Sequence, residues 1–385
     1  MSSVAATPTA DRAVALDALH EDIARKNMFP FWATTEGPGH DEVKRLMGAA
    51  PHAVPFLWSY ADVIEPLLVK AAKLVTTVES ERRSLILVNP GLAPRRATVT
   101  TLYTAYRLND PNEVMPPHRH SPSAIRFGLT GKQNFTGVEG EDMTFGPGDL
   151  VLTPHDTWHN HGNVGDEPAV NLSVLDLPLV ETLNAVYFEH DYKELENGKA
   201  VSKNKQTARL PSDYSERIYG QGGYLPRFVS HHRGTGAASP MYCYRWEPLR
   251  ELLEKHKDWD GDPYEALTVE YVDPVNGGPL FKTMTFFAQM LRPGERTRPI
   301  KQTASLLVTP FEGGGLGHTV VGSKRFDWKN FDTLAVPAGE WYEHVNASQN
   351  QPIILFVASD EPALRAFGLH KKWGRSAAGD VEKLI

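Results

Sequence analysis

The sequence predicts a mainly β protein made of two small β-barrels in tandem, with helices flanking them. From about residue 83 onward, short β-branched and aromatic runs alternate with Gly and Pro, as is typical of sandwiches and barrels. This texture occurs twice along the chain and forms a weak internal repeat. The length of 385 residues is also enough for about two domains.

Helices are expected before the β-rich part. Residues 1–12 are small and polar, and we expect a disordered tail there. Apolar residues then recur at helical spacing over 16–28, until Pro30 ends the pattern. The same spacing over 63–78 predicts a second helix.

The strands expected in the first β region are 85–88, 98–105, 125–129, 133–136, 150–153 and 170–174. A mixed, polar connection follows, with a helical stretch at 248–256. The texture then returns, with strands expected at 282–291, 305–309, 334–336 and 353–358. The predicted organisation is a helical segment with the first strand or strands, a first barrel, a connection, a second barrel and a tail, at 1–95, 96–180, 181–275, 276–368 and 369–385.

Composition narrows the function classes. A net charge of -7 argues against a general nucleic-acid binder, which usually presents a basic surface. No apolar run reaches the roughly 18 residues of a membrane span, so no membrane association is expected. The single cysteine, Cys243, excludes an internal disulfide, and the N-terminus lacks the pattern of a secretory signal. We therefore expect a cytoplasmic protein.

Histidines at alternate positions suggest a metal centre. His118 and His120 would lie on one face of a strand, and so would His159 and His161. A lone His-x-His pair is usually incidental, but here two such pairs could converge on one barrel interior. Three neutral imidazoles suit iron, zinc, copper or nickel.

The spacing of these residues resembles the two motifs of cupin barrels, carried by His118, His120, Gly131, Gly148, Pro154, His159 and Asn163. The resemblance implies a jelly-roll barrel that binds one metal through His118, His120 and His159, with His155 structural or exposed. Ala124 stands where the usual pattern has a glutamate ligand. Three neutral ligands would leave open positions for a bidentate anion and for dioxygen.

A substrate pocket is expected beside the metal. Arg126 shares the strand parity of the histidines, and a buried guanidinium needs an anion, either a substrate carboxylate or a structural salt-bridge partner. Arg107 and Tyr103 share parity on the preceding strand and could also face inward. Arg82 and Ser84, at the start of the strand before that, are further candidates.

Two more polar residues complete the expected site. His161 is interpreted as a catalytic hydrogen-bond partner of substrate or oxygen and a proton carrier, and not as a fourth ligand. Asp176 follows a strand and could orient a metal-binding histidine from behind.

The chain resembles the gentisate 1,2-dioxygenase family, which includes salicylate and 1-hydroxy-2-naphthoate dioxygenases. The resemblance covers most of the chain. It is carried by Pro55-x-x-Trp58-x-Tyr60, Pro66-Leu67-Leu68, Glu81-Arg82-Arg83, Asn89-Pro90-Gly91, Pro117 to His120, Ser123 to Phe127, Trp158 to Gly162, Leu175 to Val180 and Thr297-Arg298-Pro299.

The resemblance implies a homotetrameric bicupin with one iron(II) per chain, bound by His118, His120 and His159 in the first barrel. The family's carboxylate-binding arginine corresponds to Arg126, its substrate-contacting histidine to His161 and a further pocket arginine to Arg82. Arg107 stands where salicylate-type members carry a glutamine. The second barrel should be metal-free, with His344 near a ligand-like position and Arg296 and Arg298 in place of His-x-His.

The implied activity is an iron(II)-dependent, extradiol-type cleavage of gentisate by dioxygen. It breaks the ring between the carboxyl-bearing and hydroxyl-bearing carbons and gives maleylpyruvate. The same reaction on salicylate, a 5-substituted salicylate or 1-hydroxy-2-naphthoate is the first alternative. A metal-dependent cupin isomerase or binding protein is the second. A storage bicupin without chemistry is disfavoured, because it does not need His118, His120 and His159.

Overall fold

The computed structural model describes residues 10–28, 30, 52–75 and 83–385, in two compact units, 1–52 and 53–385. In the first unit, helix α1 spans Ala10–Arg25, earlier than the expected 16–28, and has no buried residue. It ends before Asn27, whose φ of 57° is left-handed backbone typical of helix ends. Residues 1–9 of the expected tail lie outside the described residues. No helix of the described ranges is long and apolar enough to cross a membrane.

The second unit begins with a strand and two helical segments. Strand β1 spans Phe56–Trp58, and the π-helical turn η2, Tyr60–Ile64, leads into α3, Glu65–Leu74. The proline in the first turn of α3 suits a helix start, because its missing N–H has no intrahelical acceptor there. The helix expected over 63–78 is therefore confirmed up to Leu74, and 76–82 lie outside the described residues.

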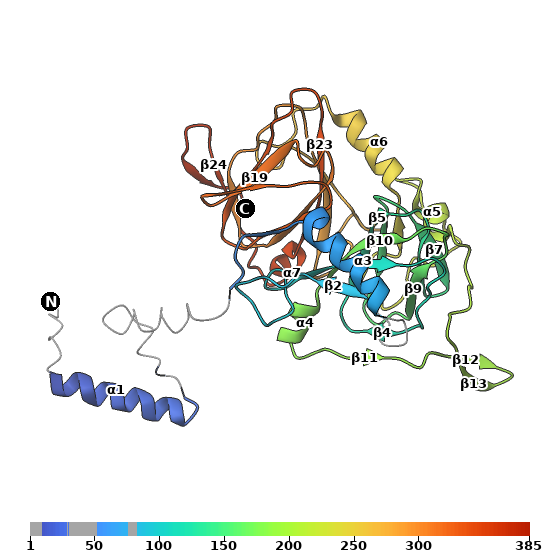
Figure 1. The fold of residues 1–385 in the computed structure, drawn as a ribbon, viewed down its shortest axis with the longest axis horizontal. Helices are drawn as coiled ribbons and strands as arrows, with labels where there is room; N and C mark the ends of the chain where they lie inside the picture. Colours follow the sequence, from blue (N-terminus) through green and yellow to red (C-terminus); the bar gives the residue numbers. More distant parts are fainter. Residues whose placement is uncertain (1–9, 29, 31–51, 76–82) are drawn as a thin grey trace. The chain divides into compact units, whose positions relative to one another are not determined.

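The first barrel has a large and a small sheet (Figure 1). The large sheet has the order β14-β8-β5-β10-β3-β2, with β2 Ser84–Ile86, β3 Tyr103–Asn109, β5 Ala124–Thr130, β8 Leu150–Thr153, β10 Ala169–Leu175 and β14 Cys243–Tyr244. The small sheet has the order β7-β6-β9, with β6 Asn134–Val138, β7 Glu141–Phe145 and β9 His159–Asn163. The strand expected over 98–105 starts only at Tyr103, because Thr98 and Val99 donate to the Leu102 carbonyl in a turn.

The second barrel repeats this plan. One sheet has the order β1-β21-β18-β23-β16-β15, with β15 Leu267–Glu270, β16 Thr285–Leu291, β18 Leu306–Glu312, β21 Thr333–Val336 and β23 Ile353–Ser359. The other has the order β20-β19-β22-β17-β24-β25, with β17 Ile300–Gln302, β19 Gly317–Val321, β20 Lys324–Asp327, β22 Trp341–Asn346, β24 Lys372–Arg375 and β25 Val381–Lys383. Two jelly-roll barrels in tandem confirm the expected fold class.

The segments outside the barrels join them together. The connection contains α4 Leu177–Thr182, α5 Tyr214–Tyr219, α6 Trp246–His256 and the hairpin of β12 Lys193–Glu196 with β13 Lys199–Ser202; α7 Glu361–Ala366 follows the last strand of the second barrel's first sheet. Strand β1, from the N-terminal segment, pairs with β21 of the second barrel. Strand β14, from the connection, pairs with β8 of the first barrel. The N-terminal segment, which leads into the first barrel, therefore adds a strand to the second barrel, and the connection adds a strand to the first.

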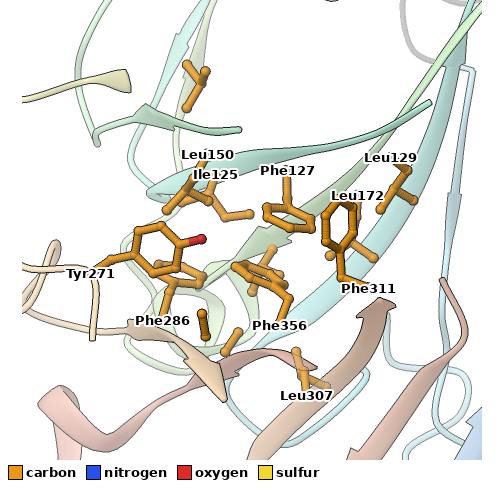
Figure 2. Packing of buried hydrophobic residues seen from close by; sticks show 14 of the residues in the cluster. Ile125, Phe127, Leu129, Leu150, Leu172, Tyr271, Phe286, Leu307, Phe311 and Phe356 are labelled. Carbon is orange, nitrogen blue, oxygen red and sulfur yellow. The ribbon is translucent and has the colours of Figure 1, made fainter. Parts of the chain in front are cut away.

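The main hydrophobic core lies between the barrels (Figure 2). Alternate residues of β5 face opposite sides of its sheet, so Ile125 and Phe127 join this core while Arg126 points into the barrel. Phe127 stacks on Phe356 of β23, with ring centroids 4.0 Å apart and planes 9° from parallel. Because the outer faces supply this core, the interior of the first barrel can hold polar residues.

Candidate metal centre and substrate pocket

His118, His120 and His159 meet inside the first barrel. The strand β4, Arg119–His120, carries one histidine, and the preceding His118 pairs with His159 across an antiparallel bridge. One ring nitrogen from each histidine lies within 4.8 Å of the others, and all three side chains are buried. The structure thus brings together the three residues that the sequence predicts as metal ligands.

Backbone carbonyls set the tautomer of each imidazole. The Nδ1 atoms of His118, His120 and His159 lie 3.1, 2.7 and 2.8 Å from carbonyl oxygens, which only accept hydrogen bonds. In a neutral ring Nδ1 must therefore carry the proton, which leaves the lone pair on Nε2. This arrangement is typical of metal-binding histidines, whose other nitrogen donates to a fixed acceptor.

The site fits a divalent metal. His159 Nε2 is buried and accepts no hydrogen bond from the described residues. Burial, followed by the nearby His118 and His120, lowers the pKa of His159 well below its usual range and keeps this ring neutral. Ala124 is fully buried on β5, and its methyl side chain offers no oxygen at the position of the usual carboxylate. Three imidazole nitrogens are therefore the donors that gather here among the described residues.

Arg126 and His161 form a pair next to the three histidines. The Arg126 guanidinium lies 3.2 Å from His161 Nε2, and Thr136 Oγ1 lies 3.0 Å from His161 Nδ1. Because a guanidinium can only donate, Nε2 is the acceptor and Nδ1 carries the proton. Burial, followed by Arg126, lowers the pKa of His161 well below its usual range. His161 is thus a neutral base whose acceptor atom faces Arg126 and not the ligand cluster.

A cavity of about 260 Å³ opens beside this pair. Its walls include His120 and Arg126 together with Ser84, Tyr103 and Arg107, as the sequence predicts. Arg107 is buried, and its Nε donates to Asn109 Oδ1 over 2.8 Å while its other end contacts Met115 Sδ. Arg82 lies outside the described residues.

Other residues of the cavity were not expected from the sequence. Arg96 and Glu181 form an ion pair with 3.3 Å between Nη2 and Oε1, and both line the cavity. Strand β11, Phe188–Glu189, pairs with β4 and sets the Phe188 ring edge-on to His120, with 5.3 Å between centroids. His190 lies 6.2 Å from His118, centroid to centroid. Glu181, Phe188 and His190 lie in the polar connection and Arg96 lies in the loop before β3, and no sequence motif marks any of them.

Asp176 does not have the position expected for it. Its Oδ1 accepts from the Ser123 backbone N–H at 2.8 Å, and its Oδ2 accepts from Thr283 Oγ1 at 2.6 Å. The metal-site histidines instead donate to backbone carbonyls. Asp176 therefore joins the two barrels and does not orient a ligand. The position of Asp176 on its strand could not predict this role, because one of its two hydrogen-bond partners, Thr283, comes from the second barrel.

Strand register identifies the matching positions of the second barrel. His118 faces His159 in the first barrel, and Ile300 faces Tyr342 in the second. Likewise Thr136 faces His161, and Thr319 faces His344. The expectation that Arg296 and Arg298 replace His-x-His is wrong: the matching residues are Ile300 and Gln302. His344 matches His161 and not a ligand, so the second barrel repeats none of the three metal-site histidines.

Comparison with known proteins agrees with this geometry. The cupin domain family model matches residues 108–175. The chain is 34% identical over 371 residues to the 5-aminosalicylate 1,2-dioxygenase of a Comamonas species, covering 94% of this chain and 91% of that one. It is also 34% identical to gentisate 1,2-dioxygenase 1 of Aquipseudomonas alcaligenes, over 83% and 87% of the two chains.

Solved structures show the same fold. Salicylate 1,2-dioxygenase from Pseudaminobacter salicylatoxidans superposes with a TM-score of 0.76 and 27% identity, covering 97% of this chain and 99% of that one. Its adduct with gentisate gives a TM-score of 0.78 at 26% identity, over 97% and 96% of the chains. With the buried histidine cluster and the barrel repeat, these likenesses show that the chain belongs to the gentisate and salicylate 1,2-dioxygenase family of ring-cleaving bicupin enzymes.

Proposed function

We propose that this enzyme uses iron(II), bound by His118, His120 and His159, to cleave gentisate to maleylpyruvate. The observation that carries the proposal is the placement of Arg126 and His161 beside a cluster of three imidazoles, with Arg126 and His120 lining one cavity. Three neutral donors without a carboxylate match an iron(II) centre that leaves room for two further partners. When bound, iron(II) holds the aromatic acid and dioxygen together and passes electrons between them.

Arg126 is proposed to bind the substrate carboxylate. Its side chain lines the cavity, and a guanidinium matches a carboxylate in bidentate geometry. Three arginines line this cavity against one carboxylate, Glu181, so it favours an anionic ligand; the arginines are Arg96, Arg107 and Arg126. A carboxylate held by Arg126 would place the neighbouring ring carbon and its hydroxyl toward the histidines.

His161 is proposed to hold the proton of the substrate's ortho hydroxyl. Its Nδ1–H is fixed by Thr136, and its Nε2 accepts from Arg126 before substrate binds. When the guanidinium turns to the carboxylate, Nε2 becomes available to accept a proton from the phenol. Because the pKa of His161 is lowered, the ring starts neutral and is able to accept.

The reaction balances with one dioxygen per ring. Both oxygen atoms enter the product, and the bond between the carboxyl-bearing and hydroxyl-bearing carbons breaks. Gentisate thereby becomes maleylpyruvate without another oxidant. Phe188, which lies edge-on to His120 and lines the cavity, provides an apolar wall for the aromatic ring of the substrate.

The most direct test is an oxygen-electrode screen of iron-loaded protein with gentisate, salicylate, 5-aminosalicylate and 1-hydroxy-2-naphthoate. We expect uptake of one dioxygen per gentisate and the highest kcat/KM for that acid. A 5-substituted salicylate is the second candidate, because a relative named for 5-aminosalicylate is 34% identical over 94% of the chain. Higher kcat/KM for 5-aminosalicylate would favour it, and no uptake with any acid would refute the dioxygenase proposal.

A further inference from the structure

The second barrel encloses a cavity of its own, of about 370 Å³, within the range of roughly 300–1,000 Å³ that is usual for small-molecule sites. It shares no lining residue with the catalytic cavity. It nevertheless occupies the matching place in its barrel. Ser84 pairs with Arg107 in the first barrel, and Thr268 pairs with Gln289 in the second; all four residues line their cavities.

The charged groups that would bind an acid are replaced in this second cavity. Gln289 stands at the position of Arg107, as the same strand pairing shows. Arg126 pairs with Ser173 in the first barrel, and Val308 pairs with Val357 in the second, so Val308 stands at the position of Arg126. A carboxylate in the second cavity would find no counterpart of Arg107 or Arg126.

The charges that remain are mostly acidic. The second cavity is lined by four carboxylates and two cations, namely Asp262, Glu265, Glu270, Glu361, Arg365 and Lys372. Both cations already have acidic partners. Lys372 Nζ lies 2.8 Å from Glu265 Oε1, and Arg365 pairs with Glu361. An anionic ligand is therefore disfavoured in this cavity, because the surplus carboxylates repel it, whereas the arginines of the first cavity attract it.

His344 offers a donor on the inner wall. Thr319 Oγ1 accepts from Trp328 Nε1 at 2.9 Å and lies 2.8 Å from His344 Nδ1. The Thr319 hydroxyl has no other acceptor in the described part of the chain, so it donates its proton to His344 Nδ1. The neutral His344 ring therefore carries its own proton on Nε2. His344 is 1% exposed, lines the cavity, and its Nε2 has no hydrogen bond to a described residue.

Tyr342 offers a second donor beside it. Its Oη accepts from Gln302 Nε2 at 3.1 Å, and its own proton has no acceptor among the residues that the structure describes. The rings of Tyr342 and His344 lie 5.6 Å apart, centroid to centroid, and both line the cavity. Phe287, which also lines it, adds an apolar face.

We propose that the second barrel is a binding site for a small uncharged polyol of about the size of a monosaccharide. A hydroxyl group suits this site because it can accept from Tyr342 or His344 and donate to a carboxylate such as Glu265. The C–H face of a ring would lie against Phe287. The proposal does not depend on the substrate of the first barrel.

The test is titration calorimetry on the iron-loaded full chain with glucose, myo-inositol and glycerol, and with benzoate and benzylamine for comparison. We expect saturable binding of at least one polyol. Tyr342→Phe removes one donor with little change of shape and should weaken that binding about fivefold, as expected for one hydrogen bond. His344→Gln is a second variant of the same wall, and thermal unfolding verifies that each variant folds.

Two controls separate this site from the rest of the molecule. Tyr271→Phe removes a buried hydroxyl of the inter-barrel core, outside the second cavity, and should leave polyol affinity unchanged. Arg126→Ala changes only the first cavity and should also leave it unchanged. The proposal would be overturned if none of the three polyols bound saturably, or if folded Tyr342→Phe and His344→Gln bound polyol as tightly as wild type. Tighter binding of benzoate or benzylamine at this wall would also overturn it.

Discussion

Asp176, directly after β10, and Asp360, directly after β23, occupy matching positions in the two barrels, and each carboxylate binds a threonine of the other barrel. Asp176 accepts from Thr283, and Asp360 accepts from Thr101. Each also accepts from a serine backbone N–H of its own barrel, Ser123 or Ser305. Burial raises the pKa of each carboxyl to about 6. The repeat therefore ties the barrels together by reciprocal hydrogen bonds.

The contribution of Asp176 and Asp360 to the free energy of unfolding should depend on pH. A carboxyl whose folded pKa lies above its unfolded value stabilises the fold at low pH and loses that contribution as pH rises through the folded pKa. For Asp360 the shift from 3.8 to about 6 places this loss between roughly pH 4 and 6, at most about 3 kcal/mol. Asp360→Asn can still accept from the Ser305 N–H through Oδ1, can donate through Nδ2 to Thr101 Oγ1, and does not ionise.

Thermal unfolding of wild type and Asp360→Asn from pH 4.5 to 6.5 checks this prediction. The melting temperature of Asp360→Asn should rise relative to wild type as pH increases. A difference that is constant over this range would contradict the raised pKa of Asp360.

Metal content should depend on the three converging histidines. Purified protein is expected to hold about one iron per chain, because only the first barrel gathers three imidazoles among the described residues. His159→Ala should lose both iron and turnover, measured by elemental analysis and oxygen uptake. Full iron content and activity in that variant would refute the ligand assignment.

His344→Ala should leave iron content unchanged. Its Nδ1 is engaged with Thr319, and the positions that match the ligands of the first barrel hold Ile300, Gln302 and Tyr342. Elemental analysis beside wild type measures this directly. A fall in iron per chain in folded protein would show that the second barrel binds metal after all.

Arg126→Ala should lower kcat/KM at least tenfold while iron content stays near that of wild type. A charge-assisted hydrogen bond contributes about 1.5–3 kcal/mol, and each ~1.4 kcal/mol is a factor of ten. Arg126→Lys keeps the charge but loses the planar fork, so a substantial loss is expected there too. Near-wild-type kcat/KM in folded, iron-loaded variants would assign the carboxylate to Arg107 or Arg82 instead.

Phe356→Ala should destabilise the whole second unit. Phe356 stacks on Phe127 and, at 5.9 Å between centroids, on Phe286, in the core that joins the barrels. Loss of a buried phenylalanine typically costs about 3–5 kcal/mol. Denaturant unfolding should show a lower midpoint, whereas Phe367→Ala, at a site 61% exposed, should change it little.

Residues close in sequence were predictable because strand periodicity alone fixes which side of a barrel they face. His118, His120 and Arg126 share parity across neighbouring strands, and the structure places all three side chains in the first barrel interior. The same parity placed Tyr103 and Arg107 on the cavity wall. These relationships survive any error in strand ends of one or two residues.

Contacts between residues far apart in the sequence could not be predicted, because no local periodicity encodes them. The pairing of β11 with β4 brings Phe188 to His120, and Thr283 reaches Asp176 from the other barrel. Strand register likewise decided that Ile300 and Gln302 match His118 and His120, where the spacing had suggested Arg296 and Arg298. It also decided that His344 matches His161. The sequence by itself determined the bicupin fold and the three-histidine cluster, whereas only the tertiary structure decided which distant segments close the site, because packing and strand register set those contacts.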